Sequence, residues 1–222
     1  MIIFAFYFHH SIIGISMNHS NNSSFLLDKA VEELSQLPGI GKQTALRLAL
    51  HLLKKGEPAL NKFGQTFITM GANIQKCSIC QNISDREVCS ICEDQERDTQ
   101  TVCIVENIRD VLSIENTSQF NGRYHVLGGT ISPMDGIGPA DLEIDSLISR
   151  MENESIKEVI LALSTTMEGD TTNFYLYKKL QSFDIRISVL ARGVSVGDEL
   201  YYTDTITLGK SITNRSVFDP SI

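Results

Sequence analysis

Four of the five cysteines of this 222-residue chain form two Cys-x-x-Cys pairs, Cys77/Cys80 and Cys89/Cys92. Each pair can turn around one metal ion, and two such pairs can place four thiolates at the corners of a tetrahedron. Four sulfur ligands fill every position around a zinc ion and leave none for a water nucleophile. The spacing therefore predicts a structural Zn2+ site and not a catalytic one.

The same spacing bears on redox state. A pair of redox dithiols is the alternative interpretation, and it is the less favoured one. Clustered cysteines of this kind suit a metal better than a secreted disulfide framework, which indicates a reducing cytoplasm. The fifth cysteine, Cys103, lies within an apolar run and is interpreted as a small core residue.

A glycine-containing turn is the second feature that could do chemistry, in the stretch L-P-G-I-G-K-Q-T-A-L-R-L at 37–48. Gly39 and Gly41 are expected to let the backbone take positive φ and to leave no side chain in the way of a phosphate. The unpaired N–H groups of the helix that starts behind the turn favour an anion. Such a turn grips a sugar-phosphate backbone without reading bases, as a helix-hairpin-helix does.

The helix after this turn, predicted from about 42 to 55, carries a basic stripe. No Asp or Glu occurs between Leu34 and Gly56, although the net charge of the chain is -8. At 100° per residue one polar sector is formed by Gln43, Thr44, Arg47, His51, Lys54 and Lys55. Leu and Ala fill the rest, so most of the circumference must be buried against the preceding helix or another subunit. His51 is interpreted as a surface histidine. The candidate DNA contacts are Gly39, Gly41, Lys42, Gln43, Arg47, Lys54 and Lys55.

The overall charge limits this interpretation to a local contact, because proteins that coat nucleic acid usually present a broadly basic face. A tight helix-helix turn with a solvated basic face is the plainer alternative. The absence of acidic residues across the segment favours nucleic-acid binding.

The first sixteen residues are apolar, but they lack the basic start and the cleavage site of a signal peptide. They are also too short for a membrane span. We predict that the native start is Met17.

Alternating helical and strand-like patterns follow the cysteines. Strands are predicted at 101–106, 124–129, 157–164 and 185–191, with helices at 108–116, 140–151 and 172–182; two more helices are predicted at 25–36 and 58–73. Strands separated by helices of this length predict an α/β fold with a mainly parallel sheet and helices on both faces.

Four carboxylates follow two of the predicted strands, Glu106 and Asp110 after the first and Glu168 and Asp170 after the third. If these strands are neighbours, the carboxylates converge at one edge of the sheet. The cluster then has two interpretations. It is either a Mg2+ site for phosphoryl or phosphodiester chemistry or an acidic docking surface for a basic partner. For any single member, a helix N-terminus is the simplest explanation.

These motifs resemble the bacterial RecR family of recombination mediators, together with the run Y-H-V-L-G-G-T-I-S-P-M-D-G-I-G-P-A-D-L and the ending G-V-S-V-G-D-E-L-Y-Y-T-D. The resemblance extends from about Phe25 to Arg215. It implies a cytoplasmic, ring-like tetramer that clamps DNA and works with RecO, and in some bacteria RecF, to load the RecA recombinase on gapped DNA. On this basis we divide the chain into five parts. They are a non-native or disordered extension at 1–24, a helix-hairpin-helix module at 25–73, a zinc finger at 74–98, a Toprim domain at 99–191 and an oligomerisation segment at 192–222.

The resemblance also implies that Glu106, Asp110, Glu168 and Asp170 bind a partner protein, so that the chain is not an enzyme. One position departs from the family pattern, because Gln43 stands where a basic residue is usual. Arg47 matches the pattern and is the best single candidate for a DNA contact.

Two other functions remain open at the level of sequence. One is a Mg2+-dependent Toprim nuclease or primase-like enzyme. The other is a zinc-dependent adaptor that never touches DNA, in which the basic stripe is a subunit interface.

Overall fold

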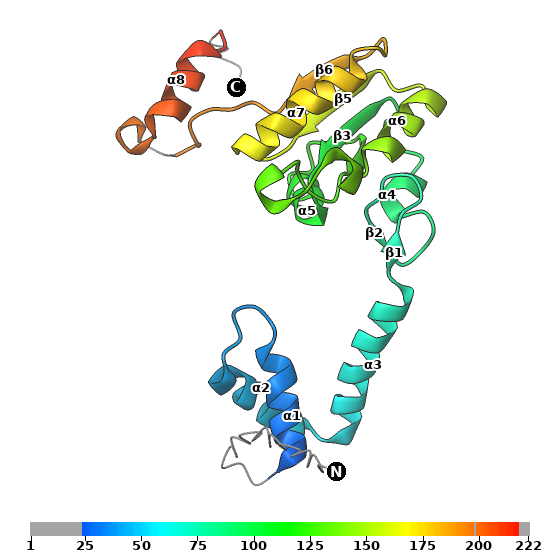
Figure 1. Cartoon of the computed structure of the whole chain (residues 1–222), viewed down its shortest axis with the longest axis vertical. Helices are drawn as coiled ribbons and strands as arrows, with labels where there is room; N and C mark the ends of the chain where they lie inside the picture. The colour runs from blue at the N-terminus through cyan, green and yellow to red at the C-terminus, as the bar shows by residue number, and fades with distance from the viewer. Residues whose placement is uncertain (1–23, 198, 218–222) are drawn as a thin grey trace, which may run out of the picture. The chain divides into compact units, whose positions relative to one another are not determined.

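The structure is a computed structural model that describes residues 24–197 and 199–217 (Figure 1). The predicted extension at 1–24 lies outside the described residues, apart from Ser24. The chain divides into two compact units, residues 1–72 and 73–222. None of the described helices has the length and apolarity needed to cross a lipid bilayer.

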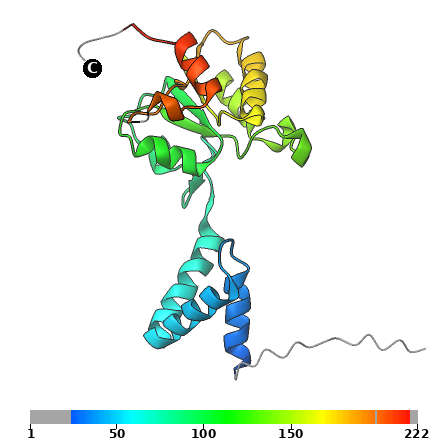
Figure 2. The same ribbon diagram turned by 90° about the vertical axis from the view of Figure 1, so that its left-hand side faces the viewer.

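The first unit consists of three helices, α1 (Phe25–Ser35), α2 (Lys42–Lys55) and α3 (Glu57–Asn73), the last of which reaches the unit boundary. Ser24 caps α1, since its side chain accepts a hydrogen bond from the Leu27 N–H at 3.4 Å. Helices α1 and α2 pack side by side (Figures 1 and 2). The three predicted helices are confirmed, with boundaries that agree to within one residue.

This unit buries little of its apolar surface. Among its described residues only Ala45 and Ala49 of α2 are buried, and both lie on one side of that helix. Large apolar side chains remain exposed on α2 and α3, namely Leu48, Leu50, Leu53, Phe63, Phe67, Ile68 and Met70. Helix α1 therefore covers only the alanine side of α2.

The second unit contains a four-stranded parallel sheet of β3 (Thr101–Val105), β4 (Arg123–Val126), β5 (Glu158–Ala162) and β6 (Arg186–Val189). The strand order is β4-β3-β5-β6, and β3 pairs with both β4 and β5. The connecting helices are α5 (Ile108–Glu115), α6 (Ile144–Asn153) and α7 (Met167–Leu180). The predicted parallel sheet with helices on both faces is confirmed.

Alternating residues of β3 build the two sides of the core. Val102 and Ile104 pack on the side of α6 and α7, and the latter helix runs along the sheet beside β5 and β6 (Figure 1). Cys103 and Val105 pack on the side of α5, against Val111. This alternation is what a strand with both faces covered requires. Cys103 is 2% exposed, which confirms it as a core residue.

Helix α7 begins at Met167, so the predicted start at 172 was wrong. Thr166 caps the helix by accepting a hydrogen bond from the Gly169 N–H at 3.2 Å. A Cβ atom at Gly169 would lie 2.0 Å from the Ser164 carbonyl oxygen. Only glycine lets this first turn pack so close to the backbone that follows β5.

A small cysteine-containing module covers the edge strand β4. It comprises β1 (Gln75–Lys76), β2 (Ile83–Ser84) and α4 (Ser90–Glu93). The Val126 N–H donates to the Cys80 carbonyl at 2.8 Å, and Arg150 Nη1 of α6 donates to the Tyr124 carbonyl at 2.6 Å. The outer backbone groups of β4 are therefore partly satisfied and protected from pairing with another chain.

The remaining described elements are short. Two 3-10 turns, Pro133–Asp135 and Pro139–Asp141, lie between β4 and α6. After β6 come a 3-10 turn at Leu200–Tyr202 and the helix α8 (Thr205–Thr213).

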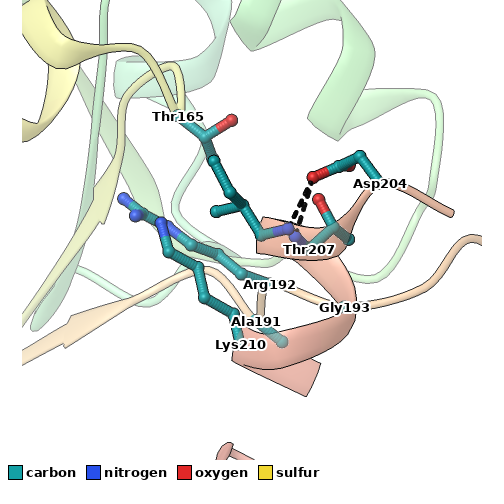
Figure 3. Close-up of a pocket in the computed structure, with 8 residues that line it drawn as sticks. Thr165, Ala191, Arg192, Gly193, Asp204, Thr207 and Lys210 are labelled. Carbon is teal, nitrogen blue, oxygen red and sulfur yellow. Dashed lines mark hydrogen bonds between the residues drawn. The ribbon is translucent and has the colours of Figure 1, made fainter. Parts of the chain in front are cut away.

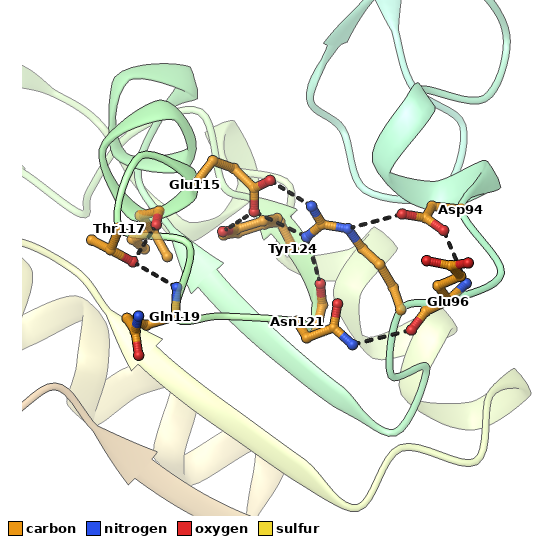
Figure 4. Close-up of polar contacts among 10 residues, drawn as sticks. Asp94, Glu96, Glu115, Thr117, Gln119, Asn121 and Tyr124 are labelled. Atoms are coloured by element: carbon orange, nitrogen blue, oxygen red, sulfur yellow. Dashed lines mark hydrogen bonds and ion pairs between the residues drawn. The ribbon is translucent and has the colours of Figure 1, made fainter.

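Arg97 ties the segment between the cysteine module and β3 to the sheet. Figure 4 labels its partner Glu115 and the neighbouring Tyr124. Its guanidinium donates to both carboxylate oxygens of Glu115, at 2.9 and 2.5 Å, and to the Gly122 carbonyl at 3.1 Å. The Tyr124 hydroxyl donates to the same carboxylate at 2.6 Å. The hydrogen bond from Arg97 is the main cause that lowers the pKa of Glu115.

We predict that Glu115→Gln lowers the free energy of unfolding by about 1.5–3 kcal/mol at neutral pH, the range for hydrogen bonds to charged groups. A carboxyl whose pKa is lowered in the folded state stabilises above its unfolded pKa, and the contribution is lost as pH falls through the folded value. The difference between wild type and variant should therefore shrink on acidification. Urea titrations at several pH values measure it.

Glu96→Gln is the matched control, because Glu96 lies on the same segment with an exposed side chain. It should change the free energy of unfolding little. A pH-independent difference for Glu115→Gln would contradict the assigned role of the ion pair.

Candidate nucleic-acid interface, zinc site and acidic edge

The turn between α1 and α2 is open, but its two glycines differ. Gly39 has φ of 80°, as expected, whereas Gly41 has φ of -80° and serves as the N-cap of α2. The predicted positive φ at Gly41 was wrong, because an N-cap residue takes an extended conformation that needs no glycine. A Cβ atom at either position would meet no atom within 4 Å.

The start of α2 nevertheless keeps the features of an anion site. No side chain caps this helix, and no acidic residue lies in its first turn. Its first N–H groups have no partner within the helix, so they can donate to a phosphate. Lys42 at the first position is exposed and adds positive charge.

The basic stripe of α2 lies opposite the buried side of the helix. At about 100° per residue, Arg47 and Lys54 point in nearly the same direction, away from Ala45 and Ala49. Both cations are exposed, and neither belongs to an ion pair among the described residues. Gln43 and His51 are exposed on the same side. The stripe is thus free to contact a ligand.

Two of the predicted basic contacts lie off this stripe. Lys42 points about 140° away from Arg47 on the helical wheel, so it belongs to the turn and not to the stripe. Lys55 lies at the end of α2, next to the Gly56 C-cap. Whether all seven candidate residues contact DNA stays a prediction.

The four clustered cysteines have the geometry of a metal site. Their Sγ atoms all lie within 4.8 Å of one another, and those of Cys80 and Cys89 are 3.6 Å apart. A tetrahedron with Zn–S bonds of about 2.3 Å has edges of about 3.8 Å. All four thiols are buried and none is in a disulfide.

The protonation chemistry of this cluster also fits a cation. Hydrogen bonding to the Cys80 thiol stabilises the thiolate of Cys89 and lowers the pKa of Cys89 to about 2. The same contact raises the pKa of Cys80 to about 12, and the pKa of Cys92 is raised as well by its hydrogen bond with Cys80. Four thiolates can coexist in this space only when a metal ion neutralises them.

The backbone shapes the cluster. The Cys89 N–H donates to the Cys77 sulfur at 3.3 Å, as outer hydrogen bonds do in metal centres. Gln81, directly after the first pair, has φ of 62°, which closes the turn that the first pair forms. The predicted structural zinc site at Cys77, Cys80, Cys89 and Cys92 is confirmed.

The acidic edge of the sheet is assembled as the strand order requires. Strands β3 and β5 are neighbours, so Glu106 and the first turn of α7 follow the same edge of the sheet. The Asp110 carboxylate accepts a hydrogen bond at 3.0 Å from the backbone N–H of Asn107, the N-cap residue of the same helix. It completes a capping box at the start of α5.

Asp170 has a partner that the sequence did not reveal. Arg192 forms a two-pronged ion pair with it, at 2.6 and 3.4 Å, and this contact is the main cause that lowers the pKa of Asp170. Glu106 and Glu168 take part in none of the ion pairs among the described residues. Among the described residues, the four cysteines are the only group of three or more His, Cys, Asp or Glu side chains placed so that they could hold a metal ion.

Arg192 also lines a cavity of about 440 Å³ between the acidic edge and α8 (Figure 3). Lys210 and Thr165 line it too, with Asp204, whose carboxylate caps α8 by accepting from the Ile206 and Thr207 N–H groups. The positive side chains of the cavity are therefore balanced by Asp170 and Asp204. No local pattern predicted this cavity, because its walls come from three separate segments.

Family comparisons cover almost the whole described chain. Models of the RecR helix-hairpin-helix, the RecR four-cysteine zinc finger domain, the Toprim domain and the RecR C-terminal region match residues 27–69, 74–94, 100–191 and 193–216. The chain is 58% identical to the recombination protein RecR of Bacteroides thetaiotaomicron over 90% of this chain and 97% of that protein. Identity to the RecR of Porphyromonas gingivalis is 58%, over 90% and 97% of the two chains. Identity to the RecR of Flavobacterium johnsoniae is 55%, over 89% of this chain and 96% of that protein.

Removal of zinc should loosen more than the cysteine module. We predict that a strong chelator exposes the amides of 77–92 to hydrogen exchange and also that of Val126, whose acceptor is the Cys80 carbonyl. The amides of β3 and β5 should stay protected. Hydrogen exchange with mass spectrometry, before and after chelation, measures this.

Cys103→Ser is the control, because Cys103 lies outside the cluster. It should keep one zinc ion per chain, whereas Cys89→Ser should bind zinc more weakly. Equal zinc content and equal affinity in the two variants would contradict the site.

Proposed function

The chain belongs to the RecR family of recombination proteins, and on that premise we propose that it is a DNA-binding recombination mediator without catalytic activity. The observation that carries the proposal is the unpaired basic stripe of Arg47 and Lys54, next to an uncapped helix start. In an acidic protein such a stripe provides a local, sequence-independent grip on the phosphate backbone.

We propose further that several copies act together as a tetrameric clamp. The exposed leucines of α2 and the exposed aromatic residues of α3 support this, since apolar surface of this extent usually marks an interface. A ring would bring several basic stripes to one DNA molecule. Their weak contacts would then add through effective concentration.

The acidic edge is proposed as a docking surface for a basic partner protein, RecO and in some bacteria RecF. Glu106 and Glu168 are available for such a partner. Asp110 caps α5 and Asp170 pairs with Arg192, so these two carboxylates are already engaged. This division of roles supports docking over a Mg2+-dependent nuclease or primase. Loading of RecA on gapped DNA and a cytoplasmic location belong to the same proposal.

Arg47→Ala should weaken DNA binding several-fold and flatten its salt dependence. For every phosphate that the variant no longer neutralises, the slope of log affinity against log salt should fall by about 0.9 on duplex DNA. The fold should persist, because the Arg47 side chain is exposed and has no ion-pair partner among the described residues. Fluorescence anisotropy at several salt concentrations measures both quantities.

Arg186→Ala removes the same charge from the Toprim sheet and should leave the slope unchanged. Conversely, Gln43→Lys adds a charge to the stripe and should steepen it. Equal slopes for Arg47→Ala and Arg186→Ala would refute the proposed interface.

A mediator should leave DNA intact. Incubation of the purified chain with gapped duplex and Mg2+ should therefore yield no cleavage or synthesis products on a denaturing gel. Products that disappear in Glu106→Gln and Glu168→Gln would instead establish a Mg2+-dependent enzyme.

A further inference from the structure

Helix α7 is apolar on two opposite sides. Thr172, Leu176 and Leu180 are buried against the sheet. On the other side, Met167 is 82% exposed and Phe174 is 63% exposed. A helix that only covers a sheet needs one apolar stripe. Met167 and Phe174 therefore add little buried surface to the fold of a single chain.

We define the outer face of α7 as the residues that point away from the sheet at about 100° per residue. They are Met167, Asp170, Thr171, Phe174, Tyr177, Lys178 and Gln181. Phe174 lies directly opposite the buried stripe and in the middle of the helix.

Charge is separated along this helix. Its first turn carries Glu168 and Asp170, and its last turn carries Lys178 and Lys179. This arrangement complements the helix dipole. It is also complementary to itself, because an antiparallel copy of the helix would place each acidic end beside a basic end.

We propose that the outer face of α7 binds the outer face of α7 in a second copy of this chain, antiparallel and around a two-fold axis at Phe174. Such a contact is isologous, with the same surface on both copies. Two residues therefore face each other when the mean of their residue numbers is 174. Phe174 then meets Phe174 of the second copy, and Asp170 meets Lys178. Thr171 and Tyr177 form the next pair, and Met167 and Gln181 the outermost one. Each of these residues lies on the outer face.

The groups that would form the contact are accessible. Asp170 keeps 48% of its side chain exposed despite its ion pair with Arg192, and a carboxylate can accept further hydrogen bonds. Lys178 Nζ lies 5.4 Å from the centre of the Phe174 ring, so it reaches along the outer face. The aromatic centre and the charged flanks match the anatomy of a protein interface.

Single-stranded DNA is the competing occupant, since it stacks bases on exposed aromatic rings. A surface for DNA needs excess positive charge, whereas the outer face with its neighbours Glu168 and Arg192 carries two acids and two cations. The charge pattern therefore favours a second copy over a phosphate backbone. A standard protein interface buries about 800 Å² on each partner, and one pair of helices buries less. This contact would therefore act together with other contacts between copies.

This inference goes beyond the proposed function, and it rests on that function only in requiring more than one copy of the chain. It adds a contact in the Toprim domain to the exposed apolar surface of α2 and α3. It does not involve the basic stripe, so the two can be tested separately.

Phe174→Cys in the full chain tests the contact. Packed helices with axes about 8–10 Å apart bring facing Cα atoms to roughly 3.5–5.5 Å, which overlaps the about 4.4–6.8 Å that a disulfide spans. Mild oxidation should therefore link most of the chains into dimers on a non-reducing gel. The native cysteines should add little background, because all five are buried.

Lys179→Cys is the matched control, because it is exposed on the same helix but lies off the outer face. It should link much less. Adding Lys178→Glu to Phe174→Cys should suppress linking by opposing Asp170 of the second copy, whereas adding Lys179→Glu should not. Circular dichroism and zinc content verify the fold of each variant.

Absent linking at position 174, or equal linking at positions 174 and 179, would overturn the inference. A second outcome would also overturn it. If single-stranded DNA protects the thiol introduced by Phe174→Cys from a thiol reagent, the face binds nucleic acid. Salt-dependent DNA binding of the same proteins, measured in parallel, keeps the two proposals distinct. Loss of linking with normal DNA binding would refute the helix pair alone.

Discussion

The hydrogen bond between the Val126 N–H and the Cys80 carbonyl joins the zinc site to the sheet. Edge strand β4 has backbone groups that must find partners, and the first cysteine turn supplies one of them. A zinc ion bound by the four thiolates would hold this turn in shape, and Arg150 donates a hydrogen bond to the neighbouring Tyr124 carbonyl. Strand β4 therefore depends on the zinc module for a backbone partner, and the zinc module depends on the sheet for a fixed position.

The parallel sheet in turn positions the acidic groups. Neighbouring parallel strands end on the same side, so Glu106 and the start of α7 share an edge of the sheet. The four acids then differ in the partners that the fold gives them. Asp110 caps a helix and Asp170 holds Arg192, whereas Glu106 and Glu168 belong to none of the ion pairs among the described residues.

Both units leave apolar side chains in water. In the first unit only two alanines of α2 are buried among the described residues, while the leucines and aromatic residues of α2 and α3 stay exposed. In the second, α7 exposes Met167 and Phe174 on the side away from the sheet. Burial of this surface would release free energy in proportion to its area, which is the physical ground for the proposed assembly.

The sequence by itself determined the features that depend on neighbours along the chain. Cysteine spacing predicted the zinc ligands, helical periodicity predicted the exposed stripe of Arg47 and Lys54, and alternating patterns predicted the parallel sheet. Only the tertiary structure decided the pairing of Asp170 with Arg192 and the early start of α7, where Gly169 packs against Ser164. It also gave Gly41 an ordinary φ, as an N-cap. The ion pair depends on which segments the fold brings together, and local sequence carries no record of such a distant contact. The other two outcomes depend on where a helix begins, which the spacing of apolar residues does not fix.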